Sequence, residues 1–195
     1  MSRVEPTTMN ILCSGNPNHN TVASAIKKCF PSVDFASRAT GYDLRFWDPG
    51  SETYFKEQIV NYNIFINSSF ICSGGQLSLL ETTHDSWSEA GVCGHIINIG
   101  STAEYLGVND RQVNDKVYAT YSIQKRALKD RSLQLNGANN IKTTHIIAGG
   151  LNDGQPGHET WLDLTHIANT ITWVINHPCL VPLIEIRANY LNLNK

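Results

Sequence analysis

A tyrosine and a lysine, Tyr121 and Lys125, lie four positions apart in the segment YATYSIQK, which contains few helix breakers. Positions i and i+4 of a helix share one face, so the two side chains are expected to project together. An unperturbed tyrosine has a pKa of about 10, and a neighbouring ammonium stabilises the phenolate and lowers that pKa. Such a pair can protonate a carbonyl oxygen or deprotonate an alcohol. An ordinary packing face of a helix is the alternative interpretation.

A turn rich in Gly, Asn and Pro, CSGNPNHNTVAS, follows the first apolar segment and opens a predicted helix. A helix N-terminus offers unpaired N–H groups and a positive dipole end, both suited to a pyrophosphate. Only one glycine is present, with His19 and Thr21 where further glycines are usual, but asparagine also tolerates left-handed backbone. A polar turn with Asn20 as the N-cap is the alternative. The candidate phosphate-binding residues are Gly15, Asn16, Asn18, His19 and Asn20.

The second apolar segment ends at Ser37 and Arg38. Dinucleotide-binding folds place an acidic residue near this point for the ribose of NAD, or an arginine for the 2′-phosphate of NADP. Arg38 therefore favours NADP, with NAD still possible, and a solvated surface arginine is the alternative. In the next segment, GYDL, Asp43 beside Leu44 is expected to accept a hydrogen bond from the adenine amino group, or simply to cap a turn.

Short apolar segments alternate with segments of helical character. The predicted strands cover 9–14, 33–37, 63–69, 95–101, 142–150 and 179–186. The predicted helices cover 20–30, 51–61, 76–90, 114–136 and 158–176. This alternation predicts an α/β fold: one Rossmann-like domain over 1–195, with a doubly wound parallel sheet and helices on both faces. Ligands of such sheets bind beyond the carboxyl ends of the strands, where the residues above are expected to lie.

The order of the motifs resembles the short-chain dehydrogenase/reductase family over most of the chain, from ILCSG through INSS, INIGS, YSIQK and IIAGG to the closing strand. The resemblance implies hydride transfer between NADP(H) and a small carbonyl or alcohol substrate. In it Tyr121 is the acid/base, Lys125 lowers the pKa of Tyr121 and holds the nicotinamide ribose, and Ser101 donates to the substrate oxygen. It also implies cofactor contacts from a turn after the third predicted strand and a turn before 151: Asn67, Ser68, Ser69, Gly149 and Gly150.

Several departures from this family keep other interpretations open. The phosphate loop lacks two glycines, no asparagine lies between Ser69 and the strand at 95–101, and the connection from Gly150 to His158 is short. A non-catalytic dinucleotide-binding or regulatory module is therefore the second hypothesis. The segment STAEYLG also resembles enzymes that act on nucleotide-linked sugars, although the chain looks too short for their substrate domain. A homodimer or homotetramer could form through 114–136 and the apolar face from Trp161 to Ile175.

Composition argues against other partners. The 15 Lys and Arg residues against 17 Asp and Glu give a net charge of -2, which provides no attraction for nucleic acid or an anionic membrane. No apolar run approaches the ~18 residues of a membrane span. Five cysteines without a CxxC pair favour a reducing, cytoplasmic location, and seven scattered histidines without HExxH predict no metal site.

Overall fold

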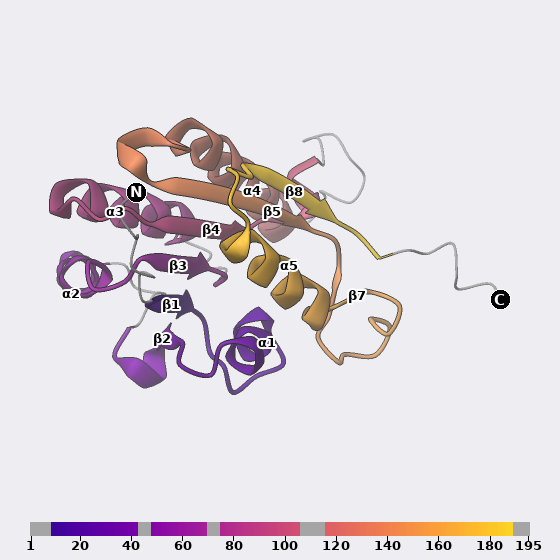
Figure 1. The fold of residues 1–195 in the computed structure, drawn as a ribbon. Helices are drawn as coiled ribbons and strands as arrows, with labels where there is room; N and C mark the ends of the chain where they lie inside the picture. Colours follow the sequence, from indigo (N-terminus) through magenta and orange to yellow (C-terminus); the bar gives the residue numbers. More distant parts are fainter. Residues whose placement is uncertain (1–8, 43–47, 70–74, 106–115, 189–195) are drawn as a thin grey trace.

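A six-stranded, fully parallel sheet forms the centre of the molecule (Figure 1). The computed structural model describes residues 9–42, 48–69, 75–105 and 116–188. The strands are β1 (Ile11–Ser14), β2 (Asp34–Ala36), β3 (Ile64–Asn67), β4 (His95–Ile99), β5 (Lys142–Ala148) and β8 (Leu183–Ile186). Each lies within a strand range that the sequence predicts. β1, β3, β4 and β5 are short, mostly buried apolar runs, whereas the edge strands β2 and β8 are partly exposed. The prediction of a parallel α/β sheet is confirmed.

The strand order is β2-β1-β3-β4-β5-β8, the doubly wound 2-1-3-4-5 order with one further strand. The chain therefore reverses direction across the sheet between β1 and β3. The helices are α1 (Val22–Cys29), α2 (Pro49–Ile59), α3 (Gly75–Ala90), α4 (Lys116–Leu135) and α5 (Leu164–Asn176). The carboxyl ends of β1 and β3 flank this switch point, where ligands of such sheets bind.

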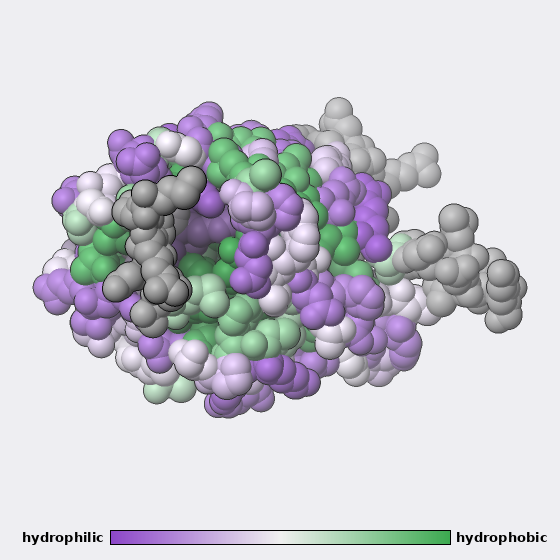
Figure 2. All heavy atoms as spheres, in the orientation of Figure 1, coloured by the Kyte–Doolittle hydropathy of each residue, from purple (hydrophilic) through white to green (hydrophobic). Residues whose placement is uncertain are grey.

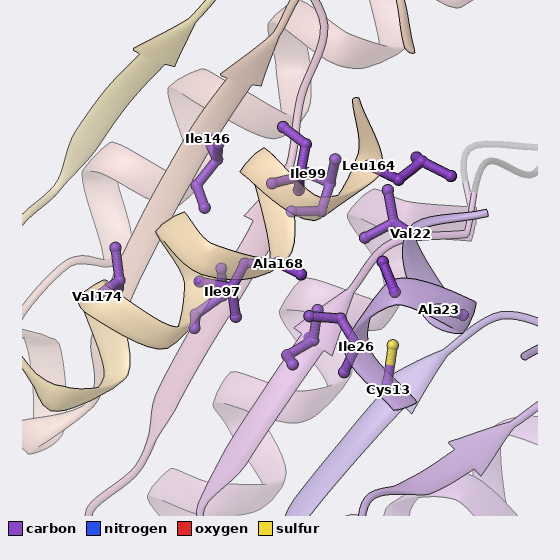
Figure 3. Close-up of a cluster of buried hydrophobic side chains, with 14 of the residues drawn as sticks. Cys13, Val22, Ala23, Ile26, Ile97, Ile99, Ile146, Leu164, Ala168 and Val174 are labelled. Carbon is purple, nitrogen blue, oxygen red and sulfur yellow. The ribbon is translucent and has the colours of Figure 1, made fainter. Parts of the chain in front are cut away.

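One face of the sheet packs against α1 and α5 (Figure 1). Figure 3 shows α5, with Ala168 and Val174, crossing the strands that carry Ile97 and Ile146, with α1 alongside. Apolar side chains form most of this layer, so the face contributes stability through burial. The apolar side of α5 that was considered for a subunit interface is thus used within the chain.

The opposite face packs against α2, α3 and α4. Phe55, Phe65 and Trp87 are fully buried there, and the Trp87 Nε1–H donates to the Ile59 carbonyl oxygen at 2.8 Å. This second core lies toward the amino ends of the strands, whereas polar residues occupy the same face toward the carboxyl ends, as described below.

Two helix starts differ from the sequence-based prediction. α5 begins at Leu164 and not at 158, because the Asp163 carboxylate caps it by accepting from Thr165 N at 2.7 Å. The preceding residues form a small parallel sheet of β6 (Leu151–Asn152) and β7 (Leu162–Asp163). The N-cap of α1 is Thr21 and not Asn20, and the Ser24 hydroxyl accepts from Thr21 N at 3.1 Å.

Hydrophilic and hydrophobic residues are interspersed on the face shown in Figure 2. The large apolar side chains exposed on α5 and β8 include Trp173 and Leu183. None of the helices in the described ranges is both long and apolar enough to cross a membrane. The same ranges contain no group of three His, Cys, Asp or Glu side chains placed to hold a metal ion.

Candidate functional site

Ser101, Tyr121 and Lys125 come together at the carboxyl edge of the sheet. Ser101 lies two residues after the end of β4, and the other two residues lie one turn apart on α4. The Ser101 side chain is hydrogen-bonded to the Tyr121 phenol. The Lys125 Nζ lies 5.5 Å from the centre of the Tyr121 ring. The helical spacing and the strand end thus place a hydroxyl, a phenol and an ammonium in one cluster.

Lys125 is a buried cation, with 4% of its surface exposed. Its Nζ donates to Gln76 Oε1 at 2.6 Å and to the Ile99 carbonyl oxygen at 2.7 Å. Burial lowers the pKa of Lys125 from 10.5 to about 7, and the nearby Glu104 carboxylate acts in the opposite direction. The ammonium is therefore poised to exchange a proton near neutral pH.

Tyr121 corrects one expectation. Burial raises the pKa of the Tyr121 phenol, and the hydrogen bond from Ser101 opposes this effect. The sequence predicts a lowered pKa for this phenol, whereas burial raises it, and the Lys125 ammonium donates its hydrogen bonds to Gln76 and Ile99. The Ser101 hydrogen bond is the contact that favours the phenolate here.

A buried row of polar side chains runs beneath this cluster, across three neighbouring strands. Asn67 of β3 is the register partner of Asn98 of β4, which is the partner of His145 of β5. All three residues are fully buried. The Asn67 Nδ2 donates to Asn98 Oδ1 at 2.9 Å, and the Asn98 Nδ2 donates to Ser132 Oγ on α4 at 3.1 Å. Asn67, expected as a cofactor contact, thus uses its amide nitrogen inside the protein.

Gln76, at the second position of α3, is the residue that connects this row to Lys125. Its Nε2 donates to the Asn67 carbonyl oxygen at 2.8 Å and to the Ile99 carbonyl oxygen at 3.2 Å. Its Oε1 is thereby fixed as the acceptor for the lysine. The sequence analysis missed Gln76, because a polar residue in the first turn of a helix carries no specific signal.

The carboxyl ends of β1 and β3 are tied together at the switch point. The Ser14 hydroxyl accepts from Ser68 N at 2.9 Å and from Ser69 N at 3.1 Å, and the Ser68 hydroxyl donates to the Ser14 carbonyl oxygen. Gly15 has φ +129°, and an added Cβ there would lie 3.2 Å from Ala23 Cβ in the first turn of α1. Gly15 thus lets α1 begin directly beside the strand ends, as a dinucleotide site requires.

The remaining residues of the predicted phosphate loop are exposed or held by the loop itself. The Asn16 Oδ1 accepts from Asn18 N at 2.9 Å, and the Thr21 hydroxyl donates to the Asn16 carbonyl oxygen at 3.1 Å. His19 and Asn20 are exposed at the N-terminal side of α1. The Asn16 side chain therefore shapes the turn. The left-handed backbone considered for the asparagines of this loop is not found, because none of them has a positive φ.

Ser37 and Arg38 follow β2, next to β1, at the same edge of the sheet. Ser37 is buried and its N–H donates to Thr40 Oγ1 at 3.0 Å, whereas the Arg38 side chain is exposed. This location suits an arginine that reaches a 2′-phosphate. Asp43 and Leu44, the predicted adenine contacts, lie outside the described residues.

Gly149 and Gly150 lie at the end of β5. The Gly149 N–H donates to the Ile186 carbonyl oxygen at 2.8 Å, which joins β5 to β8. At Gly150 an added Cβ would lie 2.7 Å from the Trp161 ring, so only glycine fits beneath this indole. The Trp161 ring in turn stacks on His158, with ring centres 3.6 Å apart. The segment after β5 is therefore a packed wall beside the edge where the cluster lies.

Comparison by sequence finds no match, since no family model and no curated protein is similar enough to this chain. Solved structures do match. A 4-hydroxyisoleucine dehydrogenase complexed with NADH has a TM-score of 0.72 and 16% identity, with 94% of this chain and 99% of that chain covered. A short chain dehydrogenase from Leptospira borgpetersenii with bound NAD+ has a TM-score of 0.71 and 14% identity, covering 93% and 92% of the two chains.

A short-chain dehydrogenase from Sphingobium yanoikuyae in complex with NADPH gives a TM-score of 0.63 at 12% identity, with 90% of this chain and 87% of that chain covered. These similarities extend over nearly the whole of each chain, and their sequence identities are too low to carry residue roles. They agree with the strand order and with the switch point between β1 and β3. The chain therefore has the fold of the short-chain dehydrogenases and reductases.

Proposed function

We propose that this chain is a divergent short-chain dehydrogenase/reductase that transfers hydride between NADP(H) and a small carbonyl or alcohol substrate. The observation that carries the proposal is the Ser101–Tyr121 hydrogen bond beside the buried Lys125 ammonium. The end of β4 supplies Ser101 and α4 supplies the other two groups, and they meet at the sheet edge where doubly wound folds bind ligands.

The residues at the switch point fit a dinucleotide. Gly15 brings the N-terminus of α1 against the ends of β1 and β3, and this helix end can receive a pyrophosphate. Arg38 is exposed beside the neighbouring strand, where it can pair with a 2′-phosphate. A bound nicotinamide would supply the hydride.

The side chains of the cluster have distinct tasks in this proposal. The Tyr121 phenol donates its proton to the carbonyl oxygen during reduction, or accepts one from the alcohol in the reverse direction. The Ser101 hydroxyl, already bonded to the phenol, donates to the developing oxyanion. The Lys125 ammonium stabilises the phenolate that proton transfer leaves behind, and Gln76 and Ile99 hold it in place.

The test is NADPH-dependent reduction of a panel of small aldehydes and ketones by the wild-type protein and by Tyr121→Phe. We expect Tyr121→Phe to lower kcat about 10²–10⁴-fold, because general acid catalysis contributes that much, while NADPH binding is retained. Tyr118→Phe is the matched control, since Tyr118 is exposed on the same helix with its ring 6.0 Å from Tyr121. Equal turnover by wild type and Tyr121→Phe would overturn the assignment.

The NADP preference is tested separately by Arg38→Ala. Loss of the guanidinium is expected to weaken NADPH binding and to leave NADH binding unchanged, because only NADPH carries the 2′-phosphate. Arg131→Ala is the control, since Arg131 lies on α4 and pairs with Glu81. Equal weakening for both cofactors would remove Arg38 as the selecting residue.

A non-catalytic dinucleotide-binding module is the second candidate. The raised pKa of Tyr121 favours it, because burial makes this phenol a poorer proton donor at neutral pH. This candidate predicts NADPH binding without turnover of any carbonyl compound.

A further inference from the structure

A buried acidic and imidazole pair lies behind the proposed site and has no part in its chemistry. Glu104 belongs to a short 3-10 segment after β4, η2 (Thr102–Tyr105), and is 1% exposed, whereas His145 of β5 is completely buried. Their Oε2 and Nε2 atoms are 3.1 Å apart. Lys129 of α4 adds an ion pair, with its Nζ 3.5 Å from Glu104 Oε1. Burying a carboxylate is costly, so its position calls for a counter-charge.

The backbone after β4 connects this pair to Lys125. The Ile99 carbonyl oxygen accepts from Lys125 Nζ at 2.7 Å. At Gly100 an added Cβ would lie 2.1 Å from His145 Nε2, so the imidazole packs directly on this backbone. The Glu104 N–H donates to the Ser101 carbonyl oxygen at 3.0 Å, which closes the turn. Lysine, histidine and carboxylate are thus fixed to one short segment that also carries Ser101.

Glu104 is the negatively charged side chain that favours the ammonium form of Lys125. The hydrogen-bond acceptors of the ammonium, Gln76 Oε1 and the Ile99 carbonyl oxygen, carry no charge. Glu104 is the group whose charge favours the ammonium, against the burial that disfavours it. Within the described ranges, the other titratable or charged groups near Lys125 and Glu104 are Tyr105 of η2, Tyr121, Arg126 and Lys129 of α4, and His145 of β5.

His145 serves as a neutral donor in this arrangement. Burial lowers the pKa of His145, and the hydrogen bond to Glu104 opposes this change. A neutral imidazole can donate to the carboxylate only from Nε2–H, which leaves Nδ1 as the unprotonated nitrogen. Nδ1 has no hydrogen-bond partner among the described residues, as this tautomer allows. His145 therefore orients Glu104 without neutralising its charge.

We propose that Glu104, oriented by His145, is the buried counter-charge that keeps Lys125 in its ammonium form beside Tyr121, so that Glu104 and His145 are positioning residues of the site. This inference rests on the proposed function for its catalytic consequence. Lys129 competes with Lys125 for the same carboxylate, because the two lysines lie four residues apart on α4. Glu104 and Lys129 therefore set the proton affinity of Lys125 in opposite directions.

The pH dependence of NADPH-driven reduction tests this opposition. Glu104→Gln removes the negative charge and is expected to move the alkaline fall of kcat/KM to lower pH by about one unit. Lys129→Met is expected to move the same fall to higher pH. Glu81→Gln is the matched control, since Glu81 pairs with Arg131 on the half-exposed surface, and should leave the profile unchanged. Profiles that coincide for Glu104→Gln, Lys129→Met and wild type would overturn the proposal.

A second measurement needs no activity. The free energy of unfolding is determined for wild type, Glu104→Gln, Lys125→Met and the double variant at pH 6 and pH 9. We expect Glu104→Gln to cost more stability with Lys125 present than in the Lys125→Met background at pH 6, with the difference much reduced at pH 9. Equal costs at both pH values would overturn the counter-charge role, whereas absence of NADPH binding would overturn only the proposed function.

If Glu104→Gln does not fold, Lys129→Met replaces it in the same comparison of wild type, the two single variants and the double variant. Lys129 is partly exposed at the surface, so its replacement is compatible with folding. At pH 6 the effects of Lys129→Met and Lys125→Met on the free energy of unfolding are expected to be non-additive, with the sign opposite to that for Glu104→Gln and Lys125→Met. No coupling for Lys129→Met would contradict the shared-carboxylate arrangement.

Discussion

The same strands present two very different faces toward their carboxyl ends. Toward α1 and α5, Ile66, Ile97 and Ile146 pack among apolar side chains. Toward α3 and α4, the adjacent residues Asn67, Asn98 and His145 form the buried polar row under Lys125. Because successive residues of a strand point to opposite faces, one sheet can combine an apolar support with a polar site. Burial of the apolar face stabilises the fold, and this offsets the destabilising effect of burying charged groups on the other face.

The largest stability loss is expected on the apolar face. Ile97→Ala removes a fully buried side chain between the sheet and α5 and should lower the free energy of unfolding by about 2–5 kcal/mol. Chemical denaturation measures this loss. Ile123→Ala, at a residue that is 56% exposed on α4, is the control and should cost about 0.5 kcal/mol or less. Similar losses at the two positions would contradict the supporting role of the apolar face.

On the polar face, Lys125→Met is expected to change how the free energy of unfolding depends on pH. Burial lowers the pKa of Lys125 to about 7 in the folded chain, whereas the ordinary lysine pKa of 10.5 applies to the unfolded chain. Between these two pKa values the unfolded state binds more protons, so wild-type stability gains about 1.4 kcal/mol per pH unit from this group as pH rises, and the full penalty is present below pH 7.

Removing the amine in Lys125→Met should abolish this contribution to the slope. Denaturation of wild type and variant at several pH values between 6 and 9 measures the difference. A slope that is identical in the two proteins would mean that Lys125 keeps an ordinary pKa in the folded state.

Gly100→Ala is expected to have an intermediate effect. A methyl group 2.1 Å from His145 Nε2 forces the imidazole or the backbone to move, and such overpacking typically costs about 1–3 kcal/mol. Gly50→Ala is the control, because its nearest neighbour would be Asp48 Oδ1 at 3.4 Å and alanine favours the helix. Unchanged stability of Gly100→Ala would show that the contact between the imidazole and this backbone is readily relieved.

The smallest effect is expected for surface charges. Glu81→Gln breaks the half-exposed pair with Arg131 and should change the free energy of unfolding by about 0–1 kcal/mol, decreasing with added salt. Denaturation at low and high ionic strength measures this change. A larger, salt-independent loss would show that this pair belongs to the buried network.

The sequence predicted the main strands because each is an apolar run between turn residues, a local signal. It also predicted the meeting of Tyr121 with Lys125, which follows from helical periodicity, and the family order placed Ser101 beside them. The start of α5 was predicted too early, since the apolar periodicity continues through Trp161, although Asp163 before Leu164 is a readable capping signal.

The polar network beneath the site was not predictable in the same way. Asn67, Asn98 and His145 become neighbours only through the register of three strands, which periodicity does not supply. Gln76 and Glu104 each look like an ordinary polar residue at the start of a helical segment. Gln76 orients the Lys125 ammonium, and Glu104 adds to the raised pKa of Tyr121.

The most direct test of the central claim is titration of the purified protein with NADPH and with NADH, followed by tryptophan quenching and by the emission of the reduced nicotinamide. We predict saturable binding, stronger for NADPH than for NADH, with the preference lost in Arg38→Ala. No binding of either cofactor at millimolar concentration would contradict a dinucleotide site at the end of β1 and, with it, the assignment of Ser101, Tyr121 and Lys125 to hydride-transfer chemistry.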